Sequence, residues 1–193
     1  MMKYYICTLL KLRRCISVLI LLGLSPVCAW AETPLGNFQD WGAFTAREDG
    51  KLVCYIGAEP ITSRGKYKKR GQTFLLVTHR PKENNKRNRF NVVSLRAGYT
   101  YKKASMVKMS IGESTFKLFT TKEWAFAENA KLDERLITAM KRGSTLTVKG
   151  VSSRGTKTTD IYSLKGFTAA YKAINKACRA WANLIPLKWA EKT

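Results

Sequence analysis

Apolar and polar residues alternate along much of the chain after residue 40, which is the period of β-strands with one buried face. The clearest case lies at 107–118. Apolar side chains occupy every second position of 107–111 and again of 116–118, and Gly112-Glu113 between them suits a two-residue turn that begins with glycine. This stretch therefore predicts a β-hairpin.

Other apolar or alternating segments predict further strands. They lie at residues 41–46, 51–57, 73–78, 90–95, 145–151 and 158–164. The first two are expected to pair around the turn at Glu48-Asp49-Gly50, and the last two to pair as a hairpin. If 73–78 and 90–95 are antiparallel neighbours, the basic residues between them form the tip of a hairpin.

In two places the period changes to that of a helix. Leu132, Leu136 and Met140 fall on one face of a helix that Gly143 would end, and a second apolar stripe runs through residues 167–181. The order is therefore several short strands followed by helix, hairpin and helix. This order predicts a mostly β fold with two α-helices, the second C-terminal, and 193 residues suit a single domain.

The first 31 residues have the layout of a secretory signal peptide. Four lysines and arginines precede an apolar run at 15–24, Pro26 follows, and Ala29 and Ala31 flank a tryptophan, so cleavage is expected after Ala31. An uncleaved membrane anchor is the alternative, but the apolar run is short for a bilayer core of about 30 Å. The residues before Cys28 do not favour lipid attachment there. No transmembrane segment is expected after cleavage.

The excess of positive charge is far larger than folding requires. The sequence carries 35 Lys and Arg against 13 Asp and Glu, a formal charge of +22. The leader holds four of the cations and no acid, so the chain from Glu32 onwards keeps a charge of +18. Because 45% of the residues are apolar, composition excludes a disordered or collagen-like protein. A field of this sign attracts polyanions.

Two cysteines, Cys54 and Cys178, remain once the leader is removed. In an oxidising compartment an isolated pair is expected to form a disulfide. Cys178 belongs to the apolar stripe of the C-terminal helix, where Cys54 on an early strand could meet it. The alternative is a reactive Cys54 served by His79, which is the one histidine in the sequence.

The sequence contains no motif for catalysis, for a metal or for a cofactor. One histidine excludes sites that need several imidazoles, and the acidic residues are scattered. There is no nucleophile elbow, Walker loop or zinc motif, and Ser-Ser-Arg-Gly at 152–155 is a weak match even to a phosphate-cradling loop. We therefore expect a protein that is not an enzyme and binds no cofactor or metal. A hydrolase assembled from distant residues is a further alternative.

Several runs of residues carry a resemblance to one family of secreted proteins. They are Phe-Gln-Asp-Trp at 38–41, Cys-Tyr at 54–55, Trp124, Ala-Met-Lys-Arg-Gly-Ser from Ala139, Ser-Arg-Gly-Thr-Lys-Thr-Thr-Asp from Ser153, and Tyr-Ser-Leu-Lys-Gly-Phe from Tyr162. In these runs, which cover most of the chain after the leader, the sequence resembles the invasion-associated locus B family.

The resemblance implies an antiparallel β-sandwich-like domain, which we place at residues 32–182. The last residues, at 183–193 with Pro186, are expected to form a loosely attached tail. The resemblance also implies export to the periplasm or cell surface of a Gram-negative bacterium, and an association with host invasion and virulence rather than with a reaction. Many members carry a further cysteine pair in the middle of the domain, which this chain lacks. Of the family's bridges, only Cys54–Cys178 therefore carries over.

Basic residues gather in two loops and one turn. The candidate polyanion-binding residues are Lys66, Lys68, Lys69, Arg70, Arg80, Lys82, Lys86, Arg87, Arg89, Lys102 and Lys103. The two loops are expected at opposite ends of a strand pair, so they need not form one patch. Candidate partners are lipopolysaccharide, anionic lipid, a host glycosaminoglycan or a protein that the sequence does not specify. Phosphate contacts alone carry no base information, so sequence-specific nucleic-acid binding is not expected.

Two other interpretations remain open. The cations can simply keep the surface solvated. Alternatively, the protein is a periplasmic structural or chaperone-like protein that binds a partner through an apolar groove, for which Trp41, Trp124 and Trp181 are candidates if they are exposed. Salt separates these possibilities, because binding led by charge weakens as salt rises whereas binding in an apolar groove does not.

Overall fold

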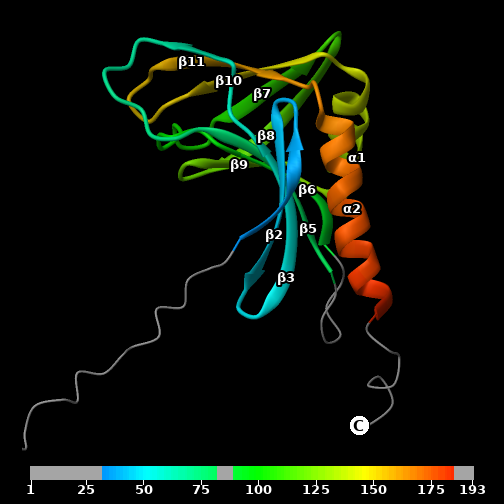
Figure 1. Ribbon diagram of the computed structural model, residues 1–193. Helices are drawn as coiled ribbons and strands as arrows, with labels where there is room; N and C mark the ends of the chain where they lie inside the picture. Colours follow the sequence, from blue (N-terminus) through cyan, green and yellow to red (C-terminus); the bar gives the residue numbers. More distant parts are fainter. Residues whose placement is uncertain (1–31, 82–88, 185–193) are drawn as a thin grey trace, which may run out of the picture.

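The structure, a computed structural model, describes residues 32–81 and 89–184 (Figure 1). The expected signal peptide at 1–31, most of the expected tail at 183–193, and Lys82, Lys86 and Arg87 lie outside the described residues. The strands are β1 (Thr33–Phe38), β2 (Trp41–Glu48), β3 (Lys51–Ala58), β4 (Thr62–Gly65), β5 (Phe74–Arg80), β6 (Arg89–Arg96), β7 (Met106–Ile111), β8 (Ser114–Thr121), β9 (Trp124–Phe126), β10 (Thr145–Val151) and β11 (Lys157–Ser163). The helices are α1 (Ala130–Arg142) and α2 (Phe167–Leu184).

All strands of the described chain belong to one antiparallel sheet, in the order β1-β2-β3-β5-β6-β9-β8-β7-β10-β11-β4. This confirms the mostly β, antiparallel fold with two helices, the second C-terminal. Strands β3 and β5 pair directly, whereas β4, which lies between them in sequence, pairs with β11 at the far edge of the sheet. Figure 1 shows β10 and β11 running almost at right angles to β2 and β3, so the sheet twists strongly along its width.

The expected hairpins are present. Strands β7 and β8 pair around Gly112, whose φ of 53° lies in the left-handed region that glycine adopts without strain. Strands β2 and β3 pair as expected, and so do β10 and β11, although β11 begins and ends one residue earlier than the predicted 158–164. Strands β5 and β6 are antiparallel neighbours, which confirms the pairing on which the placement of the two basic loops depends.

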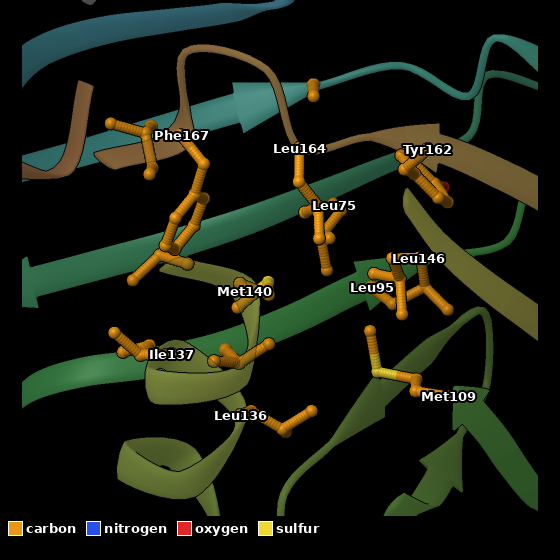
Figure 2. Packing of buried hydrophobic residues seen from close by; sticks show 14 of the residues in the cluster. Leu75, Leu95, Met109, Leu136, Ile137, Met140, Leu146, Tyr162, Leu164 and Phe167 are labelled. Atoms are coloured by element: carbon orange, nitrogen blue, oxygen red, sulfur yellow. The ribbon is translucent and has the colours of Figure 1, made fainter. Parts of the chain in front are cut away.

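One hydrophobic core lies between the sheet and the two helices. Helix α2 packs against β2 and β3, and α1 packs against β6. Figure 2 shows side chains from distant elements pointing into this core, among them Leu75 of β5, Met109 of β7, Met140 of α1 and Phe167 of α2, all of which are buried. Helix α2 therefore covers one face of the strands that begin the sheet.

Helix α1 is fixed at its first turn by two side chains. Asn129 caps the helix by accepting a hydrogen bond from the backbone N–H of Leu132 at 3.0 Å. Asp133 is buried and accepts a hydrogen bond from the backbone N–H of Val93 at 2.9 Å, which joins the helix to β6. This carboxylate therefore holds the helix to the sheet as well as complementing the helix dipole.

The expected disulfide is present. Cys54 of β3 and Cys178 of α2 form a bridge that links residues 124 positions apart, and both side chains are fully buried. Cys54 therefore has no free thiol, and the alternative of a Cys54 nucleophile served by His79 is wrong.

Candidate functional site

The first basic loop lies against two other turns of the chain. It forms the connection from β4 to β5, where the backbone N–H of Gly71 donates to the carbonyl of Gly98 at 2.9 Å. The turn between β10 and β11 approaches from the other side, because the N–H of Ser153 donates to the carbonyl of Thr100 at 2.8 Å. Three segments that are distant in sequence thus meet at one end of the sheet.

Gly98 lies where its segment touches the basic loop at Gly71, and only glycine fits at this position. Gly98 has a φ of 70°, and a Cβ atom on it would overlap the backbone carbonyl of Gly71. A side chain at position 98 would therefore push the basic loop away from the sheet.

Arg70 anchors the basic loop from beneath. Its guanidinium forms a bidentate ion pair with Asp160 of β11, with N···O distances of 2.6 and 2.7 Å, and its Nε donates to the carbonyl of Ala97 at 2.7 Å. Ser63 donates to the same carboxylate at 2.8 Å. The ring of Tyr99 lies 5.0 Å from the guanidinium carbon. Burial alone would lower the pKa of Arg70, but Asp160 raises it, so the guanidinium stays charged.

The three segments that meet here carry six exposed cations, and we call them the basic cluster. They are Lys66, Lys68, Lys69, Lys102, Lys103 and Arg154. The β4–β5 loop and the β10–β11 turn enclose a hollow of about 650 Å³, and no carboxylate lines it. Asp160 lies beneath, but its charge is neutralised by Arg70. Lys66, Lys68, Lys69 and Arg154 therefore line a concave surface of one sign.

Arg154 is a member of the basic cluster that the sequence analysis missed. It lies in the Ser-Ser-Arg-Gly turn between β10 and β11 and lines the same hollow as Lys66, Lys68 and Lys69. The sequence signal that could have identified Arg154 is the Ser-Ser-Arg-Gly turn. Its match to a phosphate-cradling loop is weak, and it gains meaning only once the turn is seen beside Lys66, Lys68 and Lys69.

The described ends of the second basic loop lie away from the basic cluster. Arg80 ends β5, at the opposite end of that strand from the β4–β5 loop, and pairs with Glu48 at 3.0 Å. Arg89 begins β6, and its side chain lies outside the described residues, as do Lys82, Lys86 and Arg87. Of the eleven candidate residues, the structure brings Lys66, Lys68 and Lys69 to one hollow and pairs Arg70 with Asp160. Lys102 and Lys103 lie on the segment next to the β10–β11 turn.

A separate groove lies on the face of the sheet that α2 leaves uncovered. It has a volume of about 1090 Å³. Its aromatic lining consists of Phe44, Tyr55, Phe74, Trp124 and Phe126. The groove is also lined by four carboxylates, those of Glu32, Asp40, Glu48 and Glu59, and by one arginine, Arg80. In a strongly basic protein this groove thus has the opposite character from the basic cluster.

The three tryptophans proposed for an apolar groove have different positions. Trp124 lines the groove just described. Trp41 is 1% exposed and donates its indole N–H to the carbonyl of Ser163, so it does not meet the condition of exposure and is not a groove residue. The side chain of Trp181 lies outside the described residues.

His79 is a buried structural residue. It lies directly opposite Cys54 in the sheet, its Nδ1 accepts a hydrogen bond from the backbone N–H of Asn91 at 3.1 Å, and the rings of Phe90 and Tyr171 pack against it. Burial lowers the pKa of His79 to about 4, and the positive charge of Arg179 acts in the same direction. The imidazole is therefore neutral at physiological pH.

Stability is expected to fall as pH drops from 6.5 to 4 because of His79. The folded pKa of about 4 lies below the unfolded value of 6.5, so the unfolded chain binds more protons in this interval. The full effect is about 3 kcal/mol. Urea unfolding at a series of pH values measures it, and His79→Gln, which keeps a neutral acceptor, should flatten this part of the profile. Parallel profiles for the two proteins would show that His79 does not cause the loss.

The described part of the chain contains no group of three or more histidine, cysteine, aspartate or glutamate residues placed to hold a metal ion. In the same residues, neither helix combines the length and apolar character that crossing a bilayer requires.

Comparison with family models matches residues 41–175 to the invasion associated locus B protein. The match spans β2 to α2 and includes Cys54, Arg70, Asp160 and Arg154. The chain belongs to the invasion associated locus B family. No curated protein and no solved structure matches it. Membership in this family, whose proteins are exported, together with the Cys54–Cys178 disulfide, is consistent with a location outside the cytoplasm.

Proposed function

We propose that this member of the invasion associated locus B family is a non-enzymatic envelope or surface protein that binds polyanionic surfaces through the basic cluster. The observation that carries the proposal is a hollow without a carboxylate that is lined by four exposed cations, Lys66, Lys68, Lys69 and Arg154. The exposed Lys102 and Lys103 lie on the segment that is hydrogen-bonded to the neighbouring β10–β11 turn. Cations held close together by the backbone repel one another, and an anionic ligand relieves that repulsion. The chemistry of the ligand is that of clustered phosphates or sulfates, as in lipopolysaccharide, anionic lipid headgroups or glycosaminoglycans.

Export fits this proposal. On this view the leader is removed after Ala31, and the protein that begins at Glu32 keeps a charge of +18 in the periplasm or at the cell surface. The disulfide suits that oxidising compartment. An exported cationic domain meets envelope and host polyanions before it meets nucleic acid.

The triple variant Lys66→Glu/Lys68→Glu/Lys69→Glu is expected to bind heparin and lipopolysaccharide at least tenfold more weakly at low salt. All three side chains are exposed, so thermal stability should remain within the range of ordinary surface changes. Titration across a salt series measures the affinity, which should fall steeply between roughly 50 and 200 mM salt in the wild type.

The matched control is Lys131→Glu/Lys172→Glu/Lys176→Glu, which makes the same change of charge on exposed positions of the two helices. An equal loss in both variants would show that affinity follows net charge and not the basic cluster. Absence of binding by the wild type at low salt would exclude the proposal.

A second candidate function, a chaperone-like role, is favoured by the aromatic groove with its four carboxylates. Its occupant would be a peptide segment of an envelope protein that combines basic and apolar side chains, because these complement the lining. Titration of such a peptide across the same range of salt concentrations tests this function. The charge-dependent part of the affinity should fall as salt rises, and the apolar part should remain.

A further inference from the structure

One row of side chains crosses five neighbouring strands on the outer face of the sheet. The register places Lys117 of β8 opposite Lys108 of β7, and Lys108 opposite Lys149 of β10. Lys149 lies opposite Thr159 of β11, which lies opposite Arg64 of β4. The four basic residues are exposed. We call these five residues the cationic row, and at a strand spacing of about 4.8 Å it is about 19 Å long.

The row is an unfavourable arrangement for the free protein. Like charges directly opposite each other destabilise a sheet, and Lys108 has a lysine on each side. The ion pairs seen between described residues, which include those of Arg70, Arg80 and Arg96, involve no member of the row. An anionic ligand laid along the row would remove this repulsion.

The flanking rows of the sheet indicate the remaining chemistry of such a ligand. On one side Thr115, Ser110 and Thr147 lie opposite one another and present hydroxyl groups. On the other side Phe119 and Met106 face each other and are 41% and 51% exposed. A ligand along the row therefore meets hydrogen-bonding groups on one flank and apolar groups on the other. Sugar rings offer both, since they carry hydroxyls and apolar C–H faces.

We infer that the cationic row binds a linear sulfated polysaccharide, laid across the strands from β8 to β4. The row ends near Lys66, which directly follows β4 and belongs to the basic cluster, so one chain can contact both. A single line of cations suits a polymer with anions along its length, whereas a flat lipid surface is best met by cations spread over a patch. This inference rests on the proposed function and names the class of polyanion.

The test is calorimetric titration of the oxidised protein from Glu32 to Thr193 with heparin-derived oligosaccharides of increasing length. Affinity is expected to rise steeply from disaccharide to tetrasaccharide, which is long enough to span the row of about 19 Å, and to rise again for longer chains that also reach the basic cluster. Lys108→Glu should lower dodecasaccharide affinity at least tenfold, because it reverses the charge at the centre of three lysines. Lys172→Glu, exposed on α2, makes the same change of charge elsewhere and should lower affinity less than threefold.

Thermal unfolding without ligand gives a second readout, in which Lys108→Glu should increase stability although it decreases affinity. A glutamate at position 108 lies between Lys117 and Lys149, so Lys108→Glu should raise the melting temperature while it weakens binding. A misfolded variant would lower both, so this pair of measurements separates loss of the site from loss of structure.

Four results would overturn the inference, and they differ from failure of the proposed function. The first is an equal loss of affinity for Lys108→Glu and Lys172→Glu. The second is an unchanged affinity for Lys108→Glu combined with a loss in the triple variant of the basic cluster, which would leave the proposed function standing. The third is tighter, Lys108-dependent binding to vesicles of anionic lipid, which would assign the row to a lipid surface. The fourth is a lower melting temperature for Lys108→Glu. No binding to any polyanion would remove the proposed function itself.

Discussion

Asp160→Asn is expected to lower the free energy of unfolding by about 3–5 kcal/mol, because it leaves the guanidinium of Arg70 buried without a counter-charge. The side chains of Arg70 and Asp160 are 6% and 3% exposed, and two N···O contacts join them. Asp160 also accepts a hydrogen bond from Ser63, which an amide satisfies less well. Urea unfolding followed by tryptophan fluorescence, to which the buried Trp41 contributes, measures the loss.

The control for this prediction is an ion pair at the surface. Arg96 and Glu123 are 35% and 40% exposed, so Glu123→Gln should cost no more than about 1 kcal/mol. The double variant Arg70→Met/Asp160→Leu removes both buried charges and should recover part of the stability that Asp160→Asn loses. If Asp160→Asn and Glu123→Gln cost the same, water reaches the Arg70–Asp160 pair and the pair does not hold the β4–β5 loop.

The same ion pair explains why Arg70 is buried although the lysines next to it in the loop are exposed. In the sequence Arg70 follows Lys68 and Lys69 and looks like a further cation for a polyanion. Its partner lies 90 residues away on β11, and no local pattern indicates that pairing. Arg70 is therefore a positioning residue, and the exposed lysines beside it are left to meet a ligand.

Local patterns predicted most of the strands and both helices, because each of these elements buries one face and its period shows in the sequence. They missed β1, β4 and β9. Strands β1 and β4 form the two edges of the sheet, and β1 contains Pro34 and Gly36 with a shift of register between them. Strand β9 has three residues. Elements that are short or bury little carry too weak a period to be recognised.

Pairings between distant strands could not be predicted, and the two candidate surfaces depend on them. The lysines of the cationic row alternate with apolar residues on β7, β8 and β10, which is ordinary for half-buried strands. Their alignment follows only from the register of β7 with β10, which are separated in sequence by β8, β9 and α1. The basic cluster likewise requires the pairing of β4 with β11.

Reduction of the Cys54–Cys178 disulfide is expected to lower the free energy of unfolding by about 5 kcal/mol, because the bridge closes a very long loop. The two cysteines are 124 residues apart, and the entropy that such a loop removes from the unfolded chain grows with the logarithm of its length. Urea unfolding with and without dithiothreitol measures the effect. Reduction keeps both sulfur atoms, so the volume of the core changes little.

The double variant Cys54→Ala/Cys178→Ala separates the effect of the bridge from that of packing. Both side chains are fully buried, so this variant loses the bridge and also two sulfur atoms from the core. It should therefore be less stable than the reduced wild type, and dithiothreitol should not change its stability. A loss on reduction of less than about 2 kcal/mol would mean that contacts in the unfolded chain already bring β3 and α2 together, since the bridge then removes little entropy. In that case the packing of α2 against β2 and β3 holds the helix in place, and the covalent bond is secondary.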